Sequence, residues 1–167
     1  MVEKDVIAKE QVKFAGFVDF KELYNFCYDW LKGELFNIIE VNYTEKVKGD
    51  AKELEIVWQA TKKVTDYFRI LFDIKWKILE MKDVEVEIDG KKKKMNKLAE
   101  LKIDIKGTLE KDYNSKWEIT PTMKFFKEFY QKYIIPNRTE QMEEKVQEAL
   151  QEYKEEIKAF LELTGKK

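Results

Sequence analysis

The stretch from Arg69 to Glu110 decides the fold, and its sequence is RILFDIKWKILEMKDVEVEIDGKKKKMNKLAELKIDIKGTLE. Its centre holds Asp89-Gly90, a dipeptide that favours a two-residue type I′ turn between antiparallel strands. Folding the chain about this turn pairs apolar residues on one face: Val84 with Met95, Ile78 with Leu101, Trp76 with Ile103, Ile74 with Ile105 and Ile70 with Leu109. The opposite face pairs opposite charges: Glu87 with Lys92, Glu85 with Lys94, Lys75 with Asp104, Asp73 with Lys106 and Arg69 with Glu110. Because one register satisfies both faces, it predicts a long antiparallel hairpin.

Two features of this hairpin depart from a regular ladder. Lys77 faces Lys102 as a like-charge pair, and the pattern weakens near Lys82 and Lys97, where we expect a bend or a bulge. At about 3.3 Å per residue, a straight strand over 67–88 would be roughly 70 Å long, which exceeds the diameter of a compact domain. We therefore expect the hairpin to curve strongly or to extend from the domain as an arm.

A second hairpin is predicted earlier in the chain, where 36–48 and 52–64 flank Gly49-Asp50. If this turn sets the register, three apolar pairs share one face: Tyr43 with Ile56, Val41 with Trp58 and Ile39 with Ala60. Lys46 then faces Glu53 on the other side. This second hairpin would supply two more strands to the sheet.

The remaining elements are predicted from periodicity and caps. A short strand over Gln11–Val18 precedes a helix over Phe20–Lys32, which Asp19 caps with Glu22 at the third position. A helix capped by Thr120 is expected to break at Pro136. A second long helix, Thr139–Leu163, then carries an apolar seam that we expect to pack on the sheet of the same chain: Val146, Leu150, Tyr153, Ile157 and Phe160.

These elements predict a single domain over residues 1–167 of the α+β class. Its core would be a curved antiparallel β meander with one face covered by an N-terminal helix and long C-terminal helices. In element order the chain resembles helix-grip domains of the START-like kind, in which a curved antiparallel sheet wraps a long C-terminal helix. That resemblance implies a fold, and it implies no functional residue, because the chain carries no residue-level motif of the family.

The composition excludes several classes of function. The 167 residues include 32 basic and 33 acidic ones, for a net charge of -1, with no His and one Cys. His-dependent catalysis, a His metal site and an internal disulfide are therefore excluded, and we expect no cofactor and no metal. The balanced charge predicts no nucleic acid as partner. No segment is apolar enough for a membrane span, and without a visible signal peptide we expect a cytoplasmic protein. Abundant Lys and Glu fit a thermophilic source or an AT-rich genome equally.

The candidate site is a set of aromatic residues: Trp58, Phe68, Phe72, Trp76 and Phe126. Such residues line cavities for apolar ligands, and they also form ordinary cores. We predict a non-catalytic binding domain that holds an apolar small molecule between the sheet and the C-terminal helix. The alternative is a structural or protein-interaction module that forms a homo-oligomer through the 66–110 hairpin or the 139–163 helix. Cys27, on the apolar face of its helix, is predicted to be a buried thiol.

Overall fold

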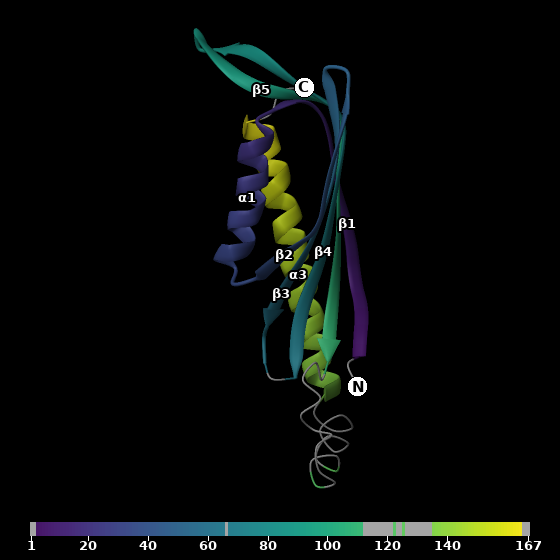
Figure 1. Ribbon diagram of the computed structural model, residues 1–167. Coiled ribbons are helices and arrows are strands. Elements are labelled where there is room, and N and C mark those ends of the chain that lie inside the picture. The colour runs from purple at the N-terminus through teal and green to yellow at the C-terminus, as the bar shows by residue number, and fades with distance from the viewer. Residues whose placement is uncertain (1–2, 66, 112–121, 123–124, 126–134, 165–167) are drawn as a thin grey trace.

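The computed structural model describes residues 3–65, 67–111, 122, 125 and 135–164, the side chains of 88, 135–137 and 164 excepted. The elements follow in the order β1 (Glu3–Val18), α1 (Phe20–Gly33), β2 (Asn37–Lys48), β3 (Ala51–Lys63), β4 (Phe68–Ile88), β5 (Lys91–Lys111) and α3 (Ile135–Thr164). The fold is of the mixed α+β class, as predicted, with a five-stranded antiparallel sheet and two described helices (Figure 1). Of the expected helix that Thr120 would cap, only residues 122 and 125 are described, and both are helical.

The sheet has the strand order β1-β5-β4-β3-β2, so β1 and β2 form its two edges. The predicted register of the long hairpin is confirmed from Phe68–Lys111 to Ile88–Lys91. Its turn is of the predicted kind, because Asp89 (φ 50°) and Gly90 (φ 77°) both adopt positive φ. The remote β1 joins this hairpin by pairing with β5, an arrangement that the sequence pattern alone did not specify.

The long hairpin bends where the sequence pattern weakens. The β4–β5 ladder is interrupted between the Leu79–Glu100 and Lys82–Lys97 pairs, and Glu80 adopts a positive φ of 50°. Beyond this point the tip turns towards the start of α1 (Figure 1). The Phe20 amide donates a hydrogen bond to Asn96 Oδ1 at 3.0 Å. The strand therefore curves over the molecule, and its bent end is attached to a helix.

The register of the β2–β3 hairpin is correct near its turn and wrong farther from it. Tyr43 does face Ile56, but a bulge at Val41 shifts the pairing by one residue. Trp58 consequently faces Glu40 and not Val41, and Ala60 faces Ile38 and not Ile39. The physical reason is that one extra residue in a strand turns every following side chain to the opposite face.

The first two elements are close to their predictions. β1 is longer than the expected 11–18, because all of its first eight residues except Ile7 also pair with β5. The Asp19 carboxylate accepts a hydrogen bond from the Glu22 amide at 3.3 Å, which confirms the predicted cap of α1. The buried side chains of α1 recur at helical spacing: Leu23, Cys27 and Leu31.

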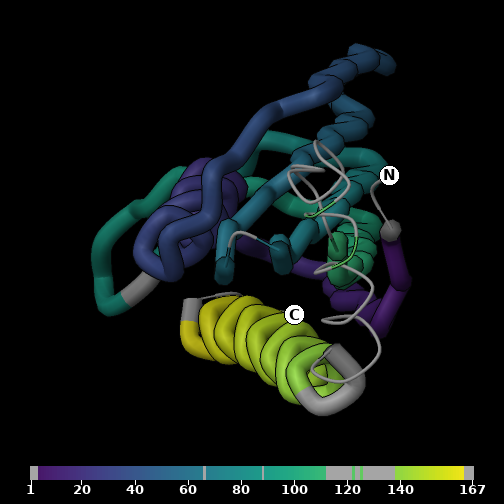
Figure 2. Tube along the Cα trace, turned by 90° about the horizontal axis from the view of Figure 1, so that it is seen from below, coloured from purple at the N-terminus to yellow at the C-terminus, as the bar shows by residue number. Residues whose placement is uncertain are grey.

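α3 and α1 share one hydrophobic core with the sheet. α3 packs chiefly against β1 and β5, and the two helices lie on one side of the sheet (Figures 1 and 2). The buried stripe of α3 contains Met142, Val146, Leu150, Tyr153, Ile157 and Leu161. Phe160, predicted for this seam, is only partly buried and stacks on Phe26 with ring centroids 4.6 Å apart. Below, the inner face is the face whose side chains enter this core, and the outer face is the other.

Gly107 of β5 shows how closely the helix approaches the sheet. A Cβ atom at this position would lie 2.9 Å from Val146 Cγ1 and 3.5 Å from Leu150 Cδ2. Only a residue without a side chain lets α3 lie this close to β5. The apolar seam of α3 is therefore occupied by its own sheet.

Candidate functional site

The predicted aromatic residues lie in the core. Trp58, Phe68, Phe72 and Trp76 are all 0% exposed, and Phe126 lies outside the described residues. Trp58 and Trp76 come together in an edge-to-face contact with ring centroids 5.3 Å apart. Phe72 lies on β4 before Trp76, where it stacks on Phe36 with ring centroids 4.8 Å apart. These contacts are typical of packed aromatic side chains.

The hollows at the surface of the described residues lie elsewhere. Three of them are lined by parts of the outer face, the β4–β5 tip and the β2–β3 turn. None of the three is lined by Trp58, Phe68, Phe72 or Trp76. An apolar ligand between the sheet and a helix thus stays a prediction.

A polar cluster borders the two buried indoles. The bulge at Val41 turns Glu40 to the inner face, where its Oε1 accepts hydrogen bonds from Tyr24 Oη (2.9 Å) and Trp58 Nε1 (3.4 Å). Partial burial and then the hydrogen bond to Glu40 raise the pKa of Tyr24 to about 12. The neighbouring Trp76 Nε1 is buried without a hydrogen-bond partner among the described residues. A buried donor without an acceptor is energetically costly.

Two further reactive groups, the Cys27 thiol and the Asp73 carboxylate, lie in different surroundings. Burial raises the pKa of the Cys27 thiol, and the hydroxyl of Tyr153 donates to the backbone carbonyl of Cys27 at 3.2 Å. On the outer face, Asp73 pairs with Lys106 at 3.7 Å. No described group of three His, Cys, Asp or Glu residues could hold a metal ion.

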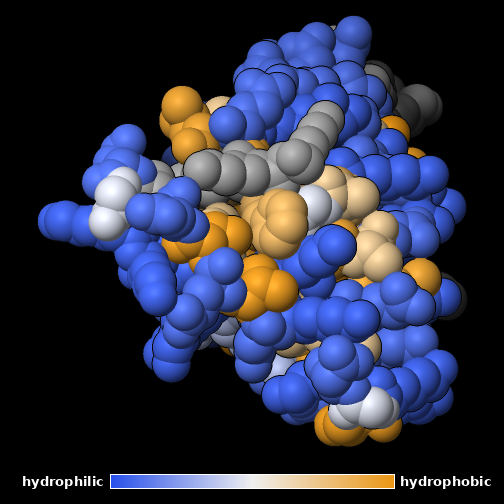
Figure 3. Space-filling view, turned by 90° about the horizontal axis from the view of Figure 1, so that it is seen from above, coloured by the Kyte–Doolittle hydropathy of each residue, from blue (hydrophilic) through white to orange (hydrophobic). Residues whose placement is uncertain are grey.

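β2 has an exposed edge that the sequence pattern did not predict. We name β2 and its four exposed apolar side chains the β2 edge: Ile39 (56% exposed), Val41 (55%), Tyr43 (49%) and Val47 (67%). β3 pairs with one side of β2, and no described strand pairs with the other. Seen from above, the end of the molecule also exposes a central group of apolar side chains among hydrophilic ones (Figure 3). On β2, apolar exposure coincides with unpaired backbone groups, a combination that favours association.

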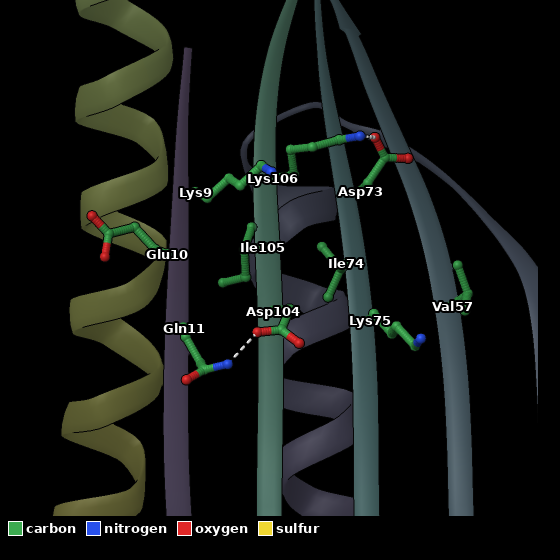
Figure 4. Close-up of a pocket in the computed structure, with 10 residues that line it drawn as sticks. All are labelled: Lys9, Glu10, Gln11, Val57, Asp73, Ile74, Lys75, Asp104, Ile105 and Lys106. Carbon is green, nitrogen blue, oxygen red and sulfur yellow. Dashed lines mark hydrogen bonds and ion pairs between the residues drawn. The ribbon is translucent and has the colours of Figure 1, made fainter. Parts of the chain in front are cut away.

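The largest of these three hollows lies on the outer face and has a volume of about 580 Å³. Its side chains come from four neighbouring strands, as Figure 4 shows. Gln11 Nε2 donates to Asp104 Oδ1 at 2.5 Å, while Lys106 pairs with Asp73. Lys9 and Lys75 border the same hollow without forming an ion pair with a described residue. The hollow is therefore open and bordered by charged side chains, unlike the aromatic interior.

Comparisons with models of protein families, with curated proteins and with solved structures find no match to this chain. In the part that the structure describes, neither helix combines the length and apolar character needed to cross a membrane.

Proposed function

We propose that this chain is a non-catalytic binding module that takes up an extended segment of a partner protein along the β2 edge. The observation that carries the proposal is the coincidence of an unpaired strand with four exposed apolar side chains. An extended peptide can add to such an edge through backbone hydrogen bonds, while pockets and apolar contacts select alternate side chains.

The two other docking surfaces that the sequence suggests differ in how far the chain itself covers them. The seam of α3 packs on β1 and β5, with Val146 and Leu150 beside Gly107. The tip of the 66–110 hairpin is attached to α1, where Lys93 pairs with Glu22 at 3.8 Å. The burial of the α3 seam favours the β2 edge over it as the place where a partner binds, whereas residues 89–94 of the hairpin tip remain exposed.

Selection from a displayed library of random peptides as long as β2, 12 residues, tests the proposal. We expect enrichment of peptides with alternating apolar side chains, because these match an extended strand. Val41→Lys should weaken a selected peptide by about tenfold, or about 1.4 kcal/mol, since a charged edge strand opposes pairing.

Val6→Lys is the matched control, because Val6 is 53% exposed on the opposite edge strand, β1. Its affinity for the selected peptide should equal that of the unchanged protein. Equal losses from the two substitutions, or a selection that enriches no peptide, would overturn the proposal.

A second candidate function is the binding of an apolar small molecule between the sheet and a helix. The observation in its favour is the unpartnered, buried Trp76 Nε1 beside Trp58, since a ligand acceptor could satisfy this donor. The order strand, helix, four strands and helix supports a relationship with helix-grip domains, which often hold such a cavity. Native mass spectrometry of the purified protein tests this candidate. A retained small molecule would support it, and a bare chain that also binds no added apolar ligand would refute it.

A further inference from the structure

Three lysines on adjacent strands are cross-strand neighbours on the outer face of the sheet. Lys13 of β1 is directly opposite Lys102 of β5, which is directly opposite Lys77 of β4. We call these three residues the lysine row. Adjacent strands are about 4.8 Å apart, so the three side chains leave the sheet as immediate neighbours. Like charges placed directly opposite each other destabilise a sheet.

Other like-charge pairs in this sheet are compensated within the chain. Lys106, which faces Lys9, pairs with Asp73 at 3.7 Å. Lys82, which faces Lys97, pairs with Asp50 at 3.8 Å. Each of these pairs therefore has a nearby carboxylate that offsets part of the repulsion.

The lysine row has less of this compensation. None of its members forms an ion pair with a described residue, although Glu55 is the register partner of Lys77 on β3. A single acidic residue at position 102 would replace two repulsive contacts by two attractive ones. Sheets usually place opposite charges across neighbouring strands. A row of like charges without ion-pair partners departs from this pattern, and such departures are typical of functional positions.

The lysine row lies beside the outer-face hollow. Gln11, Asp104 and Lys75 line that hollow, and each is two residues from a member of the row on the same strand and face. The hollow of about 580 Å³ has the size of a small-molecule site. Lys9 and Lys75 add two more ammonium groups without an ion-pair partner among the described residues (Figure 4). The lysine row and the hollow together form a surface with excess positive charge.

We propose that the lysine row binds a small ligand that carries several phosphate groups, with the rest of the ligand lying in the adjacent hollow. Three flexible ammonium groups supply up to nine donors and three charges, which suit the oxygens of an oligophosphate. A long nucleic acid is disfavoured, because the chain has a net charge of -1 and only two arginines. This site is independent of the β2 edge.

Isothermal titration calorimetry with inorganic triphosphate as the probe tests the proposal. Triphosphate should bind at least about ten times more tightly than monophosphate, and added salt should weaken the binding. Lys102→Gln should lower the affinity at least about tenfold, because this residue is the centre of the row. Lys158→Gln, on the exposed surface of α3, is the matched control and should change the affinity less than about twofold.

A second variant separates binding from folding. Lys102→Glu should raise the melting temperature of the free protein, since it removes like-charge repulsion, and should abolish triphosphate binding. The proposal is overturned if triphosphate does not bind, or if Lys158→Gln weakens it as much as Lys102→Gln. Binding to anionic vesicles or to a single-stranded oligonucleotide without binding to triphosphate would also overturn it.

Discussion

The two edges of the sheet differ in how they are covered. β1 carries one bulge, at Ile7, and α3 packs along it, with Lys154 paired to Glu10 at 2.7 Å. β2 carries one bulge, and its exposed side chains include four large apolar ones. Bulges, charges and covering helices are the usual protection of an edge strand against association. Of the two edges, β1 is thus the one that α3 covers, and β2 is the one on which we propose that a partner docks.

The charges of β2 do not remove this contrast. Glu45 pairs with Lys52 at 3.1 Å, and Lys48 pairs with Glu53 at 3.0 Å. Both ion pairs are directed towards β3, the strand already bonded to β2. These ion pairs leave the backbone groups on the far side of β2 without a strand partner among the described residues.

The largest expected effect is the difference in unfolding free energy between a substitution near the covered edge and one on the open edge. Leu150→Ala, in the helix that covers β1 and β5, should lower the free energy of unfolding by about 2–5 kcal/mol through a buried cavity. Val47→Ala, on the exposed β2, should change it by less than about 0.5 kcal/mol. Urea denaturation monitored by circular dichroism measures both values. If Val47→Ala lowered the free energy of unfolding by more than about 2 kcal/mol, the claim that Val47 lies on an uncovered edge would be wrong.

A smaller effect concerns the attachment of β2 to α1. The pKa of Tyr24 is raised from 10.0 to about 12, so its protonated hydroxyl stabilises the folded state fully below pH 10. This contribution is lost as the pH rises through 12, because the tyrosinate can no longer donate to Glu40.

Urea denaturation as a function of pH checks this point. In the unchanged protein the free energy of unfolding should fall between pH 10 and pH 12. The fall should be smaller in Tyr24→Phe, and it should be as large in Tyr28→Phe as in the unchanged protein. Identical curves for Tyr24→Phe and the unchanged protein would show that the hydroxyl does not hold β2.

The sequence predicts the parts of the fold that local chemistry determines. Asp89-Gly90 sets its turn and the long register, because charge and apolar pairs agree on both faces. Asp19 likewise caps α1 because a carboxylate beside the first turn has amide donors within reach. In both cases the decisive residues are close in sequence or follow directly from a tight turn.

The candidate surfaces depend on contacts between remote segments. The bulge at Val41 places Glu40 where Tyr24 and Trp58 donate to it, and nothing in the alternating pattern of 36–48 indicates this. The like charges of Lys77 and Lys102 are visible from the hairpin register, but Lys13 joins them only because β1 pairs with β5. Tertiary pairing therefore creates both the apolar β2 edge and the lysine row.

Hydrogen–deuterium exchange of the protein with and without a selected peptide tests the central claim most directly. An added strand would bond to the free backbone groups of β2, so amides within 37–48 should exchange more slowly when the peptide is bound. Amides of β1 should exchange at the same rate in both states. Protection confined to β1, or no protection of β2 at saturating peptide, would contradict the account.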